Sequence, residues 1–127
     1  MKGSCACGAV TFDVDGPLRP VIACHCVTCR KTSGHYWAAT SVALDRFRLT
    51  RDDGLSWFEA TPAARRGFCN RCGSSLFWEP KGGDTVSIAA GALEGPTGLS
   101  TQCHWFMEEA GDYYTPSDGL PQHAREG

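Results

Sequence analysis

The pattern of apolar and polar positions along the chain predicts many short strands and no long helix. Alternating or short apolar runs predict strands over residues 9–14, 36–42, 47–50, 55–59, 75–79, 85–90 and 102–106. Turn sequences separate them, such as Asp15-Gly16-Pro17 and Asp52-Asp53-Gly54. No stretch of helical length repeats apolar residues every three or four positions. The pattern therefore predicts an all-β domain.

Cysteine-rich segments interrupt this pattern at three places. They are residues 3–8, 24–29 and 69–73. After the second segment, residues 30–34 are polar, and we expect a loop with at most a single helical turn that ends at Gly34. We expect the strand at 75–79 to pair with the strand that precedes the third segment.

Composition narrows the class of protein. With 127 residues, 42% of them hydrophobic, the chain suits a single domain over residues 1–127 with a modest core. The formal net charge is −2, and no basic cluster indicates nucleic-acid binding. No apolar run could span a membrane and the start lacks a secretory signal, so we expect a cytoplasmic protein. Cytoplasmic thiols stay reduced, and the eight cysteines therefore favour metal binding over disulfides.

The central segment places Cys24, Cys26 and Cys29 within six residues. A tight turn can aim thiolates at one ion from these spacings, and zinc takes four such ligands at about 2.3 Å. Three sulfurs leave a fourth position to be filled, and the ligand that fills it decides whether this turn is a structural clip or a reactive site. His25 lies between two of the ligands, and we expect its side chain to point away from the metal and to form hydrogen bonds.

The outer cysteines form two pairs, Cys5 with Cys7 and Cys69 with Cys72. We infer that strands bring the two pairs together into one closed structural zinc site. The sequence equally permits the central turn to share a metal with either pair. Cys103 is most simply a small buried residue on a strand. We expect the four tryptophans in the core, and the alternative for one of them is to form a wall of the substrate pocket; they are Trp37, Trp57, Trp78 and Trp105.

Three blocks of the chain resemble the glutathione-dependent formaldehyde-activating enzyme family, which includes centromere-protein-V-like proteins. The blocks read GSCACGAV from Gly3, CHCVTCRKTSG from Cys24 and FCNRCGSSLF from Phe68. Weaker similarity continues through residues 90–93, His104 and residues 118–121. The resemblance extends over nearly the whole chain, and seven cysteines in three spaced blocks make it specific.

The resemblance implies a fold, two metal sites and an activity. The fold is a β-tent, a zinc-stabilised domain of several twisted antiparallel sheets. Residues matching the family's structural zinc ligands are Cys5, Cys7, Cys69 and Cys72, and those matching the ligands of its second, catalytic zinc are Cys24, Cys26 and Cys29. The implied activity is that of a carbon–sulfur lyase that joins formaldehyde and glutathione as S-hydroxymethylglutathione. Many members have no demonstrated substrate, so membership does not fix the reaction.

Two features depart from the family pattern. Cys103 stands just before the family's usual histidine, and Glu108-Glu109-Ala110 stands where the family often has a basic residue. If this region lines the pocket, the preferred substrate differs from glutathione.

We expect the reaction to use residues beside the cysteine turns. A small thiol would bind at the open position and add to a small aldehyde. His25 or His104 would move the proton, and Arg30, Lys31 and Arg71 would hold substrate carboxylates. An open three-thiolate site should also lose its metal more easily than a closed one.

Two other classes of function fit the same residues. A non-catalytic binding module would fill the second site with a fourth protein ligand such as Cys103. A thiol redox sensor would form a reversible disulfide within the turn from Cys24 to Cys29.

Overall fold

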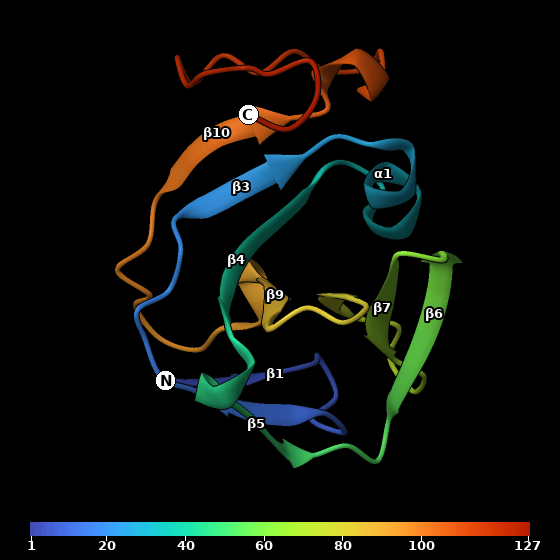
Figure 1. The fold of residues 1–127 in the computed structure, drawn as a ribbon, viewed down its shortest axis with the longest axis vertical. Helices are drawn as coiled ribbons and strands as arrows, with labels where there is room; N and C mark the ends of the chain where they lie inside the picture. Colours follow the sequence, from blue (N-terminus) through green and yellow to red (C-terminus); the bar gives the residue numbers. More distant parts are fainter.

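The computed structural model describes all residues from 1 to 127, and they form a β-rich domain with one short α-helix (Figure 1). The strands are β1 (Lys2–Ser4), β2 (Thr11–Val14), β3 (Val21–Cys24), β4 (Trp37–Ala43), β5 (Phe47–Arg51), β6 (Leu55–Thr61), β7 (Ala64–Cys69), β8 (Ser75–Pro80), β9 (Thr85–Ala89) and β10 (Thr101–Trp105). The helix is α1 (Val27–Ser33), and three 3₁₀ turns are η1 (Leu44–Arg46), η2 (Ala90–Ala92) and η3 (Met107–Glu109). The predicted all-β class is confirmed.

Two sheets build the domain. Strands β1, β2 and β5 form a small sheet, and the larger sheet has the order β10-β3-β4-β9-β8-β7-β6. Every neighbouring pair is antiparallel except β3 and β10. The larger sheet curves, so that β3 and β4 face β6 and β7 across the molecule, with α1 above them (Figure 1). The predicted pairing of residues 75–79 with the preceding strand is confirmed by the β7–β8 ladder.

The main core fills the space between the two sheets. The ring of Phe12 packs edge-on against Phe77 at 5.3 Å between centroids, and Phe47 contacts both rings. Twelve buried residues form this core, including Cys5 and Cys69. Because β7 must pass close to these rings, Gly67 has no room for a side chain: a Cβ there would lie 2.9 Å from Phe77.

The chain around the central cysteines differs from the prediction. Instead of a loop with at most one turn, a seven-residue helix begins directly after Cys26. The Cys26 sulfur accepts a hydrogen bond from the backbone N–H of Cys29 at 3.4 Å and thereby caps the helix. Gly34 ends the helix as predicted, with a left-handed φ of 85°. Strands β1 and β3 are not among the predicted strands, because Gly3 and Ser4 fall in the first cysteine segment and β3 is a short apolar run that ends at Cys24.

The tail after η3 lies along the outer side of β10 (Figure 1). The backbone N–H of His104 donates to Pro121, and His123 donates back to His104, each at 2.9 Å. This segment therefore covers the open edge of the larger sheet. No helix in the structure has the length and apolar character needed to cross a membrane.

Replacing Phe12 by alanine should destabilise the fold strongly. The side chain is 1% exposed and joins both sheets, so the free energy of unfolding should fall by about 3–5 kcal/mol. Urea unfolding of the metal-loaded protein measures this. Phe58, which is 51% exposed on β6, provides the control, and Phe58→Ala should change stability by no more than about 0.5 kcal/mol. Equal effects at the two positions would contradict this description of the core.

Candidate metal centres

Four cysteine sulfurs meet where the β1–β2 and β7–β8 turns come together. The Sγ atoms of Cys5, Cys7, Cys69 and Cys72 all lie within 4.8 Å of one another. Cys7 Sγ is 3.7 Å from both Cys5 Sγ and Cys69 Sγ. A tetrahedral zinc ion with bonds of about 2.3 Å separates its sulfurs by about 3.8 Å. The spacing therefore fits zinc, and the pairing inferred from the sequence is the one that the fold brings together.

Local backbone and hydroxyl groups support these four sulfurs. The Val10 N–H donates to Cys5 Sγ at 3.3 Å, and the Ser74 hydroxyl lies 3.2 Å from Cys72 Sγ. The Ser74 hydroxyl and backbone N–H lower the pKa of Cys72 to about 5, which favours the thiolate that a metal requires. Gly73 directly follows Cys72 and has a φ of 80°, a backbone conformation that glycine adopts without strain.

The second cluster joins the end of β3 to the first turn of α1. The Sγ atoms of Cys24, Cys26 and Cys29 also lie within 4.8 Å of one another. No fourth cysteine, histidine or carboxylate reaches this distance. Cys103 is buried on β10 opposite Ile22 and does not belong to the cluster, so the fourth-ligand role considered for it is not supported. Three protein ligands with a free position are typical of catalytic zinc sites.

A buried arginine pairs with this cluster. Arg66 on β7 is only 7% exposed, and its Nη2 donates to Cys29 Sγ at 3.0 Å. No carboxylate forms a salt bridge with Arg66. A buried guanidinium needs an anionic partner, and here only the cysteines can provide one as thiolates. This observation on the fold itself indicates an ionised, metal-binding cluster.

The thiols of the cluster also shift one another's ionisation. Hydrogen bonds from Cys24 and Cys29 hold the pKa of Cys26 far below that of a free thiol, with a smaller contribution from the charge of Arg66. The same mutual contacts raise the pKa of Cys24. Three thiols this close cannot all ionise unless added positive charge compensates them. A divalent ion together with three thiolates carries one net negative charge, and Arg66 cancels it.

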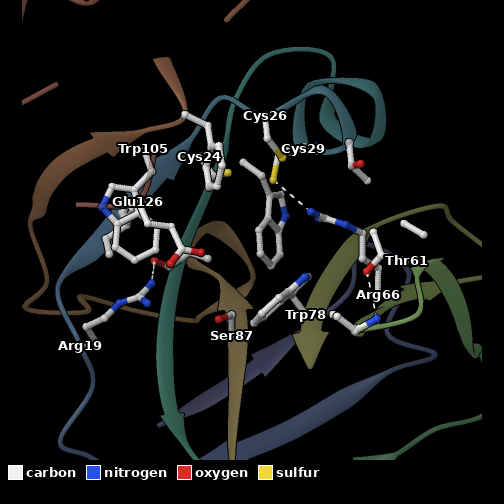
Figure 2. A pocket seen from close by; sticks show the side chains of 18 residues that line it. Arg19, Cys24, Cys26, Cys29, Thr61, Arg66, Trp78, Ser87, Trp105 and Glu126 are labelled. Carbon is white, nitrogen blue, oxygen red and sulfur yellow. Dashed lines mark hydrogen bonds between the residues drawn. The ribbon is translucent and has the colours of Figure 1, made fainter. Parts of the chain in front are cut away.

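A cavity of about 360 Å³ opens beside this cluster (Figure 2). The three cysteines lie along its upper wall, and Arg66 points from β7 toward Cys29 (Figure 2). Twelve of the 18 lining residues are hydrophobic, and the charged ones are Arg19, Arg66 and Glu126. Trp57 packs against the main core as predicted, and Trp37 belongs to a second, smaller core cluster against which Trp78 packs. The tryptophans that also line the cavity are Trp37, Trp78 and Trp105, where a wall role was expected for one of the four.

The two predicted proton carriers lie outside this cavity. His25 and His104 are 0% and 3% exposed, and neither ring lines the cavity wall. His25 points away from the sulfurs, as predicted, and its Nε2 lies 2.8 Å from His104 Nδ1. The second nitrogen of His104 donates to Asp118 at 2.8 Å, and Tyr114 closes the series through its hydroxyl and His25 Nδ1. Since Asp118 accepts from His104, the series assigns one proton to each contact: His104 accepts from His25, and His25 accepts from Tyr114.

The hydrogen-bonded series of Tyr114, His25, His104 and Asp118 fixes the cysteine turn on the side away from the cavity. Burial, followed by the nearby His104, lowers the pKa of His25 to about 4, so the ring is neutral at physiological pH. A neutral ring held at both nitrogens cannot rotate freely, and His25 is covalently placed between Cys24 and Cys26. The arrangement resembles the outer hydrogen bonds that orient metal ligands in other proteins.

The predicted substrate-binding cations do not line the cavity. Arg30 and Lys31 lie near the end of α1, and Arg71 is exposed beside the four-cysteine cluster. Sequence reasoning missed Arg19 and Arg66. The signal for Arg66 is the alternation of β7, which places it on the same inward face as buried Ala64.

The two acidic residues that depart from the family pattern also stay out of the cavity. Glu109 accepts a hydrogen bond from the first N–H of α1, on Val27, at 3.0 Å. A carboxylate at this end of a helix is favourable. Glu108 pairs with Arg125 of the tail at 3.0 Å. Their role is therefore to anchor the segment beside the cysteine turn.

The fold and the two clusters define a class: a small β-rich domain with two cysteine clusters that can hold metal ions, the second at a cavity. Comparison with known proteins gives this class a family. The family model described as glutathione-dependent formaldehyde-activating enzyme matches residues 1–109. The chain belongs to this family.

Individual relatives agree with the family. A Halomonas elongata protein that carries the family's name as a provisional assignment is 34% identical, across 74% of this chain and 66% of its own length. The matched stretch thus spans slightly less than two thirds of that relative. A Rhodobacter sphaeroides protein of known crystal structure superposes with a TM-score of 0.63 at 25% identity, covering 80% of this chain and 98% of its own.

A chelator should remove zinc from the two clusters at different rates. The three-cysteine site has a free position, so a chelator should remove its zinc first and leave the closed site loaded. Zinc release followed with a colorimetric indicator should show two phases. A Cys26→Ala variant should begin with about one ion fewer and lack the fast phase. Simultaneous release of both ions from the unaltered protein would contradict the difference between the sites.

Replacing Arg66 should weaken metal binding at the second cluster. Arg66→Met keeps an unbranched side chain but leaves three thiolates without their counter-charge, and zinc affinity should fall about 10–100-fold. Zinc content after dialysis against a competing chelator measures this. Arg65→Met is the matched control, because Arg65 pairs with Glu79 and Trp57 away from the cluster. Equal zinc retention in the two variants is the result that the charge argument does not allow.

Proposed function

We propose that this chain is a zinc-dependent enzyme that forms or cleaves adducts between a small thiol and an aldehyde, a carbon–sulfur lyase. The observation that carries the proposal is the cluster of three cysteines without a fourth protein ligand at the wall of a cavity. The family to which the chain belongs supports glutathione and formaldehyde as the starting pair to test.

Two zinc ions would serve different purposes. One would be held by Cys5, Cys7, Cys69 and Cys72, which join turns 62 residues apart and so stabilise the fold. The other would be held by Cys24, Cys26 and Cys29. When bound there, zinc supplies a Lewis acid that lowers the pKa of a coordinated thiol and polarises a carbonyl. Reduced thiols are needed at both sites, which favours a cytoplasmic location.

The chain's own residues would prepare this chemistry. The charge of Arg66 favours the thiolate form of Cys29 against the neighbouring Cys26 and the burial that raise its pKa, and the hydrogen-bonded series behind His25 keeps the turn in place. In the forward reaction the thiol S–H bond breaks, the sulfur bonds to the carbonyl carbon, and the carbonyl oxygen takes up a proton. The product is a hemithioacetal, and the reverse reaction returns thiol and aldehyde.

The predicted catalytic and substrate residues keep narrower roles in this proposal. His25 and His104 act as positioning residues for the cysteine turn. Arg30 and Lys31 on α1 and Arg71 are candidates for substrate carboxylates only outside the cavity.

The reaction can be tested with one substitution. Zinc-loaded protein should accelerate exchange between glutathione, formaldehyde and S-hydroxymethylglutathione, followed by NMR exchange spectroscopy. Cys26→Ser should lower this acceleration at least about 100-fold, because it removes one thiolate from the open site. Phe58→Ala should retain it. Full activity of Cys26→Ser at full zinc content would falsify the mechanism.

A thiol redox sensor is the second candidate, since all eight cysteines are free and three sulfurs lie within 4.8 Å of one another in the turn. That function requires mild oxidant to release zinc and to form a reversible disulfide within the turn from residue 24 to residue 29. Unchanged zinc and thiol content after oxidation excludes it.

A further inference from the structure

The cavity beside the three-cysteine cluster is larger and more apolar than formaldehyde requires. Formaldehyde contributes a single carbon, whereas the space is about 360 Å³, within the range of pockets that hold small organic ligands. Its walls include Trp37, Trp78, Trp105 and Phe106. Apolar walls of this size favour a ligand that covers them, because each buried square ångström of apolar surface contributes to binding.

Two buried N–H donors at this cavity have no partner. Arg66 Nη1 and Trp37 Nε1 each lack a hydrogen bond, although both side chains are 7% exposed and line the cavity. The guanidinium carbon of Arg66 lies 5.4 Å from the centre of the Trp37 ring. An unpaired buried donor is costly, so two neighbouring ones indicate an acceptor that the ligand itself brings.

The sulfur cluster, the free N–H donors and the apolar walls together match the groups of a hemithioacetal. Arg66 bonds to Cys29 through Nη2 and retains a free Nη1, so this donor lies next to the sulfur cluster, with the Trp37 ring centre 5.4 Å from the guanidinium carbon. In a hemithioacetal the oxygen sits on the carbon bonded to sulfur, and the aldehyde's substituent branches from the same carbon. The sulfur would face the cysteine cluster, the oxygen would face the two donors, and the substituent would contact the tryptophans.

We propose that the cavity recognises hemithioacetals of aldehydes with a bulky apolar or aromatic substituent, with Arg66 and Trp37 as donors to the oxygen. This inference rests on the proposed function and specifies its aldehyde. The bond changes are the same as for formaldehyde: the S–H bond breaks, the S–C bond forms, and the proton ends on the oxygen. No oxidant or further reactant is involved.

Stable glutathione conjugates test the apolar wall. S-benzylglutathione and S-methylglutathione differ only in the ring, and titration calorimetry on zinc-loaded protein gives both dissociation constants. We expect the benzyl conjugate to bind at least about tenfold more tightly. Trp105→Leu should lower this ratio about threefold or more, whereas the ratio should not change in Trp57→Leu, which alters a tryptophan outside the cavity. Trp78→Leu serves the same purpose if Trp105→Leu does not fold. A ratio near one in the unaltered protein overturns the inference.

A second pair of conjugates tests the donors. S-benzoylglutathione has a carbonyl in place of the CH2 of the benzyl conjugate, which puts an oxygen on the carbon bonded to sulfur. It should bind about five- to tenfold more tightly than the benzyl conjugate. Trp37→Phe keeps an aromatic wall but removes the N–H, and it should reduce this preference while leaving the benzyl-to-methyl ratio within about twofold. If the benzoyl conjugate is not preferred, the proposed donation by Arg66 and Trp37 is wrong. If the preference survives Trp37→Phe unchanged, Trp37 is not one of the donors.

Failure of the proposed function would look different. If no glutathione conjugate binds, glutathione is not the thiol, and phenylmethanethiol is then compared with methanethiol on the zinc-loaded protein. A tenfold or greater preference for phenylmethanethiol supports the apolar wall independently of glutathione. Equal binding of the two thiols overturns it.

Discussion

The hydrogen bond between Arg66 and Cys29 is the contact on which the candidate site depends. It joins β7 to α1, which lie on different sides of the cavity, and it places a full positive charge in a buried position. Such a charge persists only beside an anion, and the cysteine cluster is the only anion within reach. The same arginine therefore closes the cavity wall, sets the charge of the cluster and leaves one donor free for a ligand.

The two cysteine clusters use the same kind of side chain for different purposes. The four-cysteine cluster is part of the main core, where Cys5 and Cys69 pack with the rings of Phe12 and Phe77. Its four sulfurs would fill all the positions of a tetrahedral ion, so this cluster can only stabilise the fold. The three-cysteine cluster lies beside a separate group of apolar residues that includes Trp37. It is held by a hydrogen-bonded series behind it and has a cavity in front of it, and this asymmetry leaves one side available for chemistry.

Much of this arrangement could be predicted from the sequence. Alternation located most strands, and cysteine spacing located the three ligand-bearing segments, because both signals are local, whereas the sequence left open which segments share an ion. Contacts between distant segments could not be predicted in this way. Alternation along β7 places Arg66 and its neighbour Arg65 on opposite faces, but nothing local shows that the cysteine cluster lies beside Arg66 while Arg65 pairs with Glu79. The sequence singled out His25 and His104 as proton carriers, but it could not show their contacts, because Tyr114 lies 89 residues beyond His25 and Asp118 lies 14 residues beyond His104.

That tail has a consequence for how such proteins diversify. The family match ends at residue 109, yet Tyr114 and Asp118 hold the imidazoles that sit directly behind the ligand-bearing turn. Substitutions in the tail can thus change the geometry of the three cysteine sulfurs while every ligand stays the same. Two relatives with identical cysteine blocks can for this reason differ in metal retention through their tails alone.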